Sequence, residues 1–77
     1  MNKARRQWLE RIISELEAKR DELIDMQAEE QDAFDNMPEG LQASERGTTI
    51  EENASDLDDA QSSIDDVISN LYEILER

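Results

Sequence analysis

The sequence contains no cysteine and no histidine. The absence of cysteine excludes disulfides and thiolate chemistry. The absence of histidine excludes His-ligated zinc and the Glu-x-x-His di-iron sites of helical bundles. A small chain without disulfides is more typical of the cytosol than of secreted proteins. We therefore expect a cytoplasmic protein that carries no metal and no cofactor.

Long apolar runs are also absent. No stretch approaches the roughly 18–20 apolar residues that a membrane-spanning helix needs. The basic segment Met1 to Arg6 is not followed by the apolar core and small-residue cleavage site of a secretory signal. These features predict a soluble, unsecreted protein that does not bind membranes.

Positive charge is scarce, and the formal net charge is −13. Residues 1–20 contain six basic residues and three acids, whereas residues 21–77 contain 18 acids and only two arginines. No lysine or arginine occurs between positions 47 and 76. Such a charge repels nucleic acid and anionic membranes, and attracts basic protein surfaces at long range. High charge with few aromatic residues can also indicate disorder, but a regular apolar repeat argues against it here.

That repeat lies in residues 50–75, where seam positions recur at alternating steps of four and three, as in a coiled coil. The seam consists of Ile50, Ala54, Leu57, Gln61, Ile64, Ile68, Leu71 and Leu75. A second apolar row, formed by Ala60, Val67 and Ile74, lies beside it. The buried stripe is therefore wider than a two-stranded zipper needs.

The first half of the chain has a stripe of the same kind, interrupted by Arg20 and Gln27. It contains no glycine or proline before Pro38, which disfavours helical backbone in the residue preceding it. The sequence predicts one all-α domain over residues 1–77, a coiled-coil-like antiparallel two-helix hairpin. Its expected parts are a helix over about 3–36, a turn over 37–43 and a helix over about 44–76.

The turn carries several specific expectations. Gly40 can adopt positive φ where the chain reverses, and Leu41 is expected to fold back onto the end of the core. Ser44 is a good N-cap for the second helix. Because Gly47 weakens the first turns, a start at Thr48 remains an alternative.

Two stripes of this width cannot fully cover each other in an isolated hairpin. One flank, which includes Ile12, Met26, Val67 and Ile74, would stay exposed. Exposed apolar patches usually mark interfaces, so we expect a homodimer that forms a four-helix bundle.

Antiparallel pairing also predicts contacts near the chain ends. Trp8 comes near Tyr72, either as a plug that closes the core, which we favour, or as an interface anchor. The expected ion pairs join Arg5, Arg6 and Arg11 to Glu73 and Glu76, and Lys19 and Arg20 to Asp65 and Asp66.

Acidic pairs follow the seam at intervals of seven residues, about 10.5 Å along a helix. They are Glu51–Glu52, Asp58–Asp59 and Asp65–Asp66, and the first helix adds Glu22, Asp25, Glu29 and Asp32. Their regular spacing resembles the row of phosphates along a DNA strand, about 3.4 Å apart. The alternative is that these acids are simply the solvated face of a coiled coil. Lysines at some of these positions would make a better helix, and so would Glu in place of the many Asp residues, which favours the DNA-like interpretation.

Catalytic and calcium-binding sites find little support. The chain has no base with a pKa near neutrality and no nucleophile with triad partners, and its carboxylates lie on convex helix faces. A calcium loop starting at Asp56 would need glycine and glutamate where Gln61 and Val67 stand. We therefore expect a protein that is not an enzyme.

Residues 35–47, together with the Asp-Leu-Asp-Asp-Ala and Ser-Ile-Asp-Asp-Val-Ile repeats, resemble small acidic helical-hairpin proteins of phage and prophage genomes. The resemblance implies a phage setting and a hairpin, and it supplies no catalytic residue. By analogy of size and charge, it suggests an anti-CRISPR type of protein. We expect an inhibitor that occupies the basic groove of a host nucleic-acid-handling protein, such as a CRISPR nuclease, in the host cytoplasm, without binding nucleic acid itself. The alternative is a structural or assembly module whose charge serves only solubility.

Overall fold

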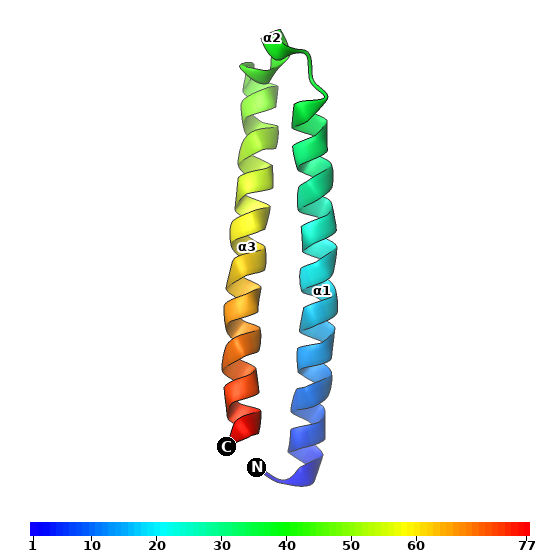
Figure 1. Cartoon of the computed structure of the whole chain (residues 1–77), viewed down its shortest axis with the longest axis vertical. Helices are drawn as coiled ribbons and strands as arrows, with labels where there is room; N and C mark the ends of the chain where they lie inside the picture. Colours follow the sequence, from blue (N-terminus) through cyan, green and yellow to red (C-terminus); the bar gives the residue numbers. More distant parts are fainter.

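Two long helices lie side by side in the computed structural model, which describes all residues 1–77 (Figure 1). They are α1 (Lys3–Asp35) and α3 (Glu45–Glu76), with the short helix α2 (Glu39–Gln42) between them. No strand is present, and the Cα positions extend over 59 × 15 × 13 Å. The prediction of an all-helical chain is confirmed. None of the helices contains an apolar stretch of the length needed to cross a membrane.

The two long helices pack against each other along their length. Arg6 donates to the Leu75 carbonyl oxygen near the chain ends, and the Asn53 amide lies 3.4 Å from Glu30 nearer the turn. Positions along α1 therefore pair with positions on α3 in reverse order. Both termini lie at the same end of the rod (Figure 1).

The seam between the helices provides the core. None of the eight predicted seam residues of α3 is exposed, and Ala54 and Ile68 are 1% and 5% accessible. On α1 only Ile13 is fully buried, at 2%. Burying one such aliphatic side chain stabilises a fold by about 1.5–3 kcal/mol. Because only three hydrophobic residues are fully buried, the structure depends on many half-buried contacts rather than on a deep core.

Local signals explain where α1 begins and ends. The Asn2 side chain accepts a hydrogen bond of 2.8 Å from the Arg5 amide, which satisfies a donor of the first turn. At the other end, Pro38 stands three residues past the helix. The Gln42 side chain reaches back from α2 and donates to the Phe34 carbonyl oxygen at 3.1 Å.

The turn differs from the expectation at Gly40. Neither glycine has positive φ, so the prediction of a left-handed Gly40 is wrong. The chain reverses instead through α2, a single helical turn in which the Leu41 and Gln42 amides donate to the Pro38 carbonyl oxygen. A right-handed turn of this kind needs no glycine.

The start of α3 is at the earlier of the two positions considered. Ser44 is the N-cap, and its hydroxyl oxygen accepts from the Gly47 amide at 3.2 Å. Gly47 is buried because the backbone of α2 crosses directly against it. A Cβ on Gly47 would lie 2.6 Å from the Leu41 carbonyl oxygen and closer still to that of Gln42. Glycine is therefore required at position 47 because a side chain would not fit there, and not because the backbone has a positive φ.

The two glycines form a matched pair for a stability test. Gly47→Ala forces the α2 backbone away, and we expect the free energy of unfolding to fall by about 1–3 kcal/mol. Gly40→Ala meets open space in a helical turn, so it should be neutral or stabilise by about 0.4–1 kcal/mol. Urea unfolding followed by circular dichroism measures both. Equal stability of the two variants would contradict the close crossing at Gly47.

Candidate functional site

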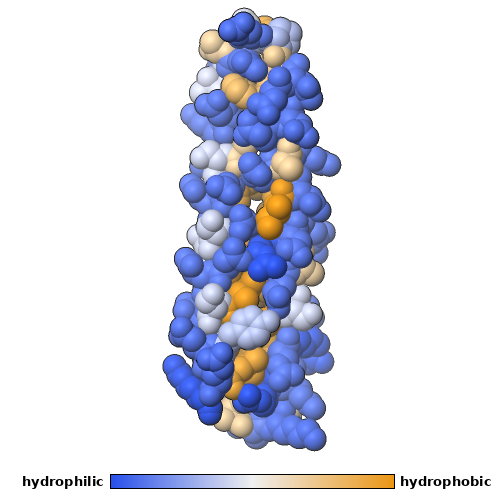
Figure 2. Space-filling view, in the orientation of Figure 1, coloured by the Kyte–Doolittle hydropathy of each residue, from blue (hydrophilic) through white to orange (hydrophobic).

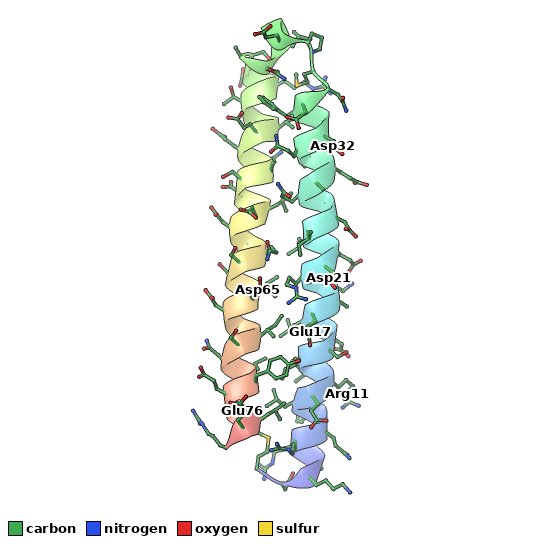
Figure 3. All side chains as sticks on the ribbon, viewed as in Figure 1. Arg11, Glu17, Asp21, Asp32, Asp65 and Glu76 are labelled. Carbon is green, nitrogen blue, oxygen red and sulfur yellow. The ribbon has the colours of Figure 1, made fainter.

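The predicted acidic residues lie along the outer surfaces of both long helices. We call these ten residues the acidic rows: Glu51, Glu52, Asp58, Asp59, Asp65 and Asp66 on α3, and Glu22, Asp25, Glu29 and Asp32 on α1. All are exposed except Asp65. Figure 3 shows carboxylates projecting from the outer edge of each helix. The structure therefore does not gather the ten into one patch; they follow the two sides of a rod.

Most of these carboxylates have no cationic partner. Glu22 forms an ion pair of 2.8 Å with Lys19, one turn away on the same helix. Asp65 pairs with Arg20 across the seam. The other eight take part in no ion pair, because the chain offers few cations and α3 has only Arg46. They are free to meet an external basic surface.

Asp65 belongs to a polar cluster that interrupts the seam. It accepts from Arg20 Nη1 at 2.9 Å and from the Gln61 amide at 2.7 Å, while Arg20 also contacts Asp21. The hydrogen bonds to Asp65 and then Asp21 raise the pKa of Arg20. This confirms the predicted Arg20–Asp65 pairing. It also removes Asp65 from the set of free carboxylates, because a charge held by Arg20 is less available to a partner.

The other predicted ion pairs are wrong. Lys19 pairs with Glu22 instead of the α3 acids, and hydrogen bonding to Glu22 raises its pKa. No ion pair joins the first turns of α1 to Glu73 or Glu76. Arg6 bonds to a backbone carbonyl oxygen, and Arg5 and Arg11 form no salt bridge. At exposed positions, water competes well with such pairs.

The prediction that Trp8 lies beside Tyr72 is wrong. The Tyr72 hydroxyl donates to Glu17 at 3.0 Å. Trp8 lies at a different hollow, beside Ile12 and Ile74, and its side chain is 57% exposed. Trp8 therefore does not plug the core.

The structure leaves one apolar surface without a partner. Trp8, Ile12, Met26, Val67 and Ile74 form what we call the apolar flank. Met26 and Val67 are 52% and 46% exposed, as the width of the stripes predicted, while Ile12 and Ile74 are half-buried. The face drawn in Figure 2 is largely hydrophilic, with only a narrow, interrupted apolar line between the helices.

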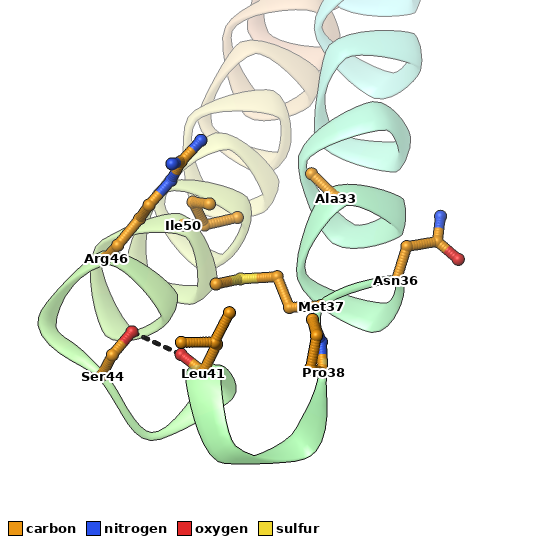
Figure 4. A pocket seen from close by; sticks show the side chains of 8 residues that line it. All are labelled: Ala33, Asn36, Met37, Pro38, Leu41, Ser44, Arg46 and Ile50. Carbon is orange, nitrogen blue, oxygen red and sulfur yellow. Dashed lines mark hydrogen bonds between the residues drawn. The ribbon is translucent and has the colours of Figure 1, made fainter.

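The hollow at the turn offers little for catalysis. It measures ≈ 440 Å³, and Met37, Leu41 and Ile50 provide its apolar wall (Figure 4). Leu41 does turn toward the end of the core, but its side chain remains 53% exposed. Arg46 is the only titratable side chain in the lining. No three carboxylates lie close enough together to hold a metal ion.

Comparison with known proteins does not assign the chain to a family: no family model matches it, and neither a curated protein nor a solved structure is significantly similar.

The contact between Tyr72 and Glu17 predicts a pH effect. The hydrogen bond to Glu17, followed by partial burial, raises the pKa of Tyr72 above its ordinary value of about 10. Because the folded-state pKa is the higher one, the stabilisation is complete at neutral pH and is lost as pH rises through that pKa. Ultraviolet absorbance of tyrosinate follows this group alone, since the chain has one tyrosine. Glu17→Gln should lower the midpoint, and an unchanged midpoint would contradict the contact.

Proposed function

We propose that the protein is a non-enzymatic inhibitor that presents its acidic rows to the basic groove of a nucleic-acid-handling protein. The observation that supports this most directly is the set of eight exposed, unpaired carboxylates on the two long helices. A CRISPR nuclease of the host is the partner class suggested by analogy of size, charge and phage setting, with the host cytoplasm as the place of action. The protein does not bind nucleic acid itself.

The spacing of the acidic rows supports mimicry of a nucleic-acid backbone. Each heptad advances about 10.5 Å along the helix, which matches about three phosphates of a DNA strand at 3.4 Å each. The carboxylates follow both sides of a rod, as two phosphate strands follow a duplex. Groups that bind phosphates, such as the arginines and lysines of a nuclease groove, bind carboxylates by the same charge-assisted hydrogen bonds.

We also propose that the unit is an antiparallel, coiled-coil-like hairpin and that two hairpins pair into a four-helix bundle. Pairing covers the apolar flank, which an isolated hairpin leaves in water. It also doubles the number of acidic rows on one particle.

A structural or assembly module of a phage is the second candidate. The exposed apolar flank favours it, because such a surface can join the protein to other helices whatever the charge does. In that case the carboxylates serve solubility alone. The two functions differ in which residues matter: the acidic rows for inhibition, and the apolar flank for assembly.

A charge-neutral variant separates them. Glu52→Gln, Asp58→Asn, Asp59→Asn and Asp66→Asn remove four unpaired charges and leave the Arg20–Asp65 pair intact, which changes the net charge from −13 to −9. We expect helix content to be unchanged and binding to a guide-loaded CRISPR nuclease to weaken strongly. The plot of log affinity against log salt concentration should become less steep by about 3, since binding through fewer charged contacts releases fewer counterions.

The matched control neutralises four acids outside the rows, Glu10, Glu39, Glu45 and Glu76, each changed to Gln. It has the same net charge and should retain most of the affinity if the rows are the binding surface. If saturating protein leaves the DNA binding of the nuclease unchanged, mimicry at that target is wrong. An equal loss of affinity for the nuclease in both four-site variants would show that binding depends only on the total charge of the protein.

A further inference from the structure

Four residues of the apolar flank, together with Lys19 and Ala60, form three rungs across the two helices. Ile12 and Ile74 line one hollow and so lie level with each other. α1 and α3 run in opposite directions. Lys19, seven residues after Ile12, is therefore level with Val67, seven residues before Ile74. In the same way Met26 is level with Ala60. The middle rung stands close to the midpoint of α1, which spans Lys3–Asp35.

Charge is distributed very unevenly along the rod. Residues 20–66, which lie on the turn side of the middle rung, have 16 acids and two arginines, a net charge of −14. The remaining residues, at the end where both termini lie, have five acids and six basic residues, a net charge of +1. Two rods side by side in the same direction would bring the two strongly negative halves together. Opposite directions bring each strongly negative half beside a nearly neutral one.

We propose that the apolar flank binds a second copy of this chain in the opposite direction, around a two-fold axis through the Lys19–Val67 rung. This inference rests on the proposed pairing of two hairpins and specifies its geometry. The whole face of the rod, 59 by 15 Å between Cα atoms, has a projected area of about 900 Å², which is close to the about 800 Å² per partner that stable interfaces bury. The interface is isologous, so each patch meets its own copy.

The axis determines which side chains meet. Ile12 packs on Met26 of the partner subunit, and Ile74 packs on Ala60 of the partner subunit. Val67 meets its own counterpart. The two Lys19 ammonium groups approach near the axis, where each already has Glu22 as a partner at 2.8 Å.

Trp8 gains a role in this arrangement. The same axis brings it level with Glu30 of the partner subunit, next to Met26 of the partner subunit. A hollow of ≈ 400 Å³ lies there, lined by Met26, Glu30, Asn53, Asp56 and Leu57. A 57% exposed indole beside a hollow with carboxylates at its edge fits an interface anchor, because its ring can be buried while its N–H donates to an acid.

Single-cysteine variants test the direction, because the natural chain has no cysteine. Val67→Cys should form disulfide-linked dimers on mild oxidation, since a residue at the axis meets itself. Met26→Cys alone should not, because its counterpart lies about 21 Å away along the rod, far beyond disulfide range. A mixture of Met26→Cys and Ile12→Cys should cross-link across the interface.

The opposite outcomes are equally specific. Same-direction pairing would place Met26 beside Ala60 of the partner subunit, so cross-linking of a mixture of Met26→Cys and Ala60→Cys would overturn the proposed direction. Asp59→Cys, on the outer face of α3, is the control for random collision. Cross-linking of that variant as fast as Val67→Cys would remove the support for this interface.

Mass and affinity complete the test. Sedimentation equilibrium of the natural chain should give twice 8.9 kDa, and a monomer at all concentrations would overturn the inference. Trp8→Ala should raise the dimer dissociation constant at least tenfold with helix content retained; an unchanged constant would exclude Trp8 as an anchor. Inhibition is measured separately by DNA competition. A dimer that fails to compete therefore refutes the proposed function and leaves the pairing intact.

Discussion

The structure depends on one line of contact between two helices. α1 and α3 contain 33 and 32 residues, yet only three hydrophobic side chains are fully buried. A two-layer rod has no interior beyond its seam, so almost every residue keeps one side in water. Stability then rests on repetition of half-buried contacts at heptad spacing and on the ends where the chain is capped. Domains of this size commonly gain additional stability from a partner chain.

The same geometry governs the surface. Since the seam takes so few positions, the sequence can place acids on most of the others without disturbing the core. Repulsion among them is reduced because long helices keep successive heptads about 10.5 Å apart and salt screens charges beyond that distance. Arg20 forms the one ion pair between the two helices, with Asp65, and it does so where Gln61 also interrupts the apolar row. That cluster fixes the register of the two helices at their middle.

Apart from Trp8, which shares its heptad position with Glu22 and Glu29, the apolar flank and the acidic rows fall on different positions of the heptad. In the proposed dimer the flank joins two copies, and the acidic rows of α3 remain exposed on the outside of the pair. An inhibitor built in this way has its charged groups on rigid helices, so little conformational entropy is lost when a basic groove closes on them. An assembly module would use the same flank with other helices. The surface chemistry of the two functions differs, but the scaffold is common to both.

The sequence by itself determined the helices, their ends and the seam, because these follow from local propensity, capping and a periodic pattern that one chain segment carries alone. The N-cap at Ser44, the unexposed row from Ile50 to Leu75 and the exposure of Met26 and Val67 were all predictable in this way. Only the tertiary structure decided what depends on the close approach of distant segments. It replaced the left-handed Gly40 by a helical turn and made Gly47 the glycine that space requires. It moved Trp8 away from Tyr72 and the core, and it withdrew Asp65 from the free carboxylates. The heptad position of a residue indicates which side of its helix it occupies. Whether it contacts a residue of the other helix depends on the axial offset and rotation between the two helices. These are determined by packing at the turn and along the seam.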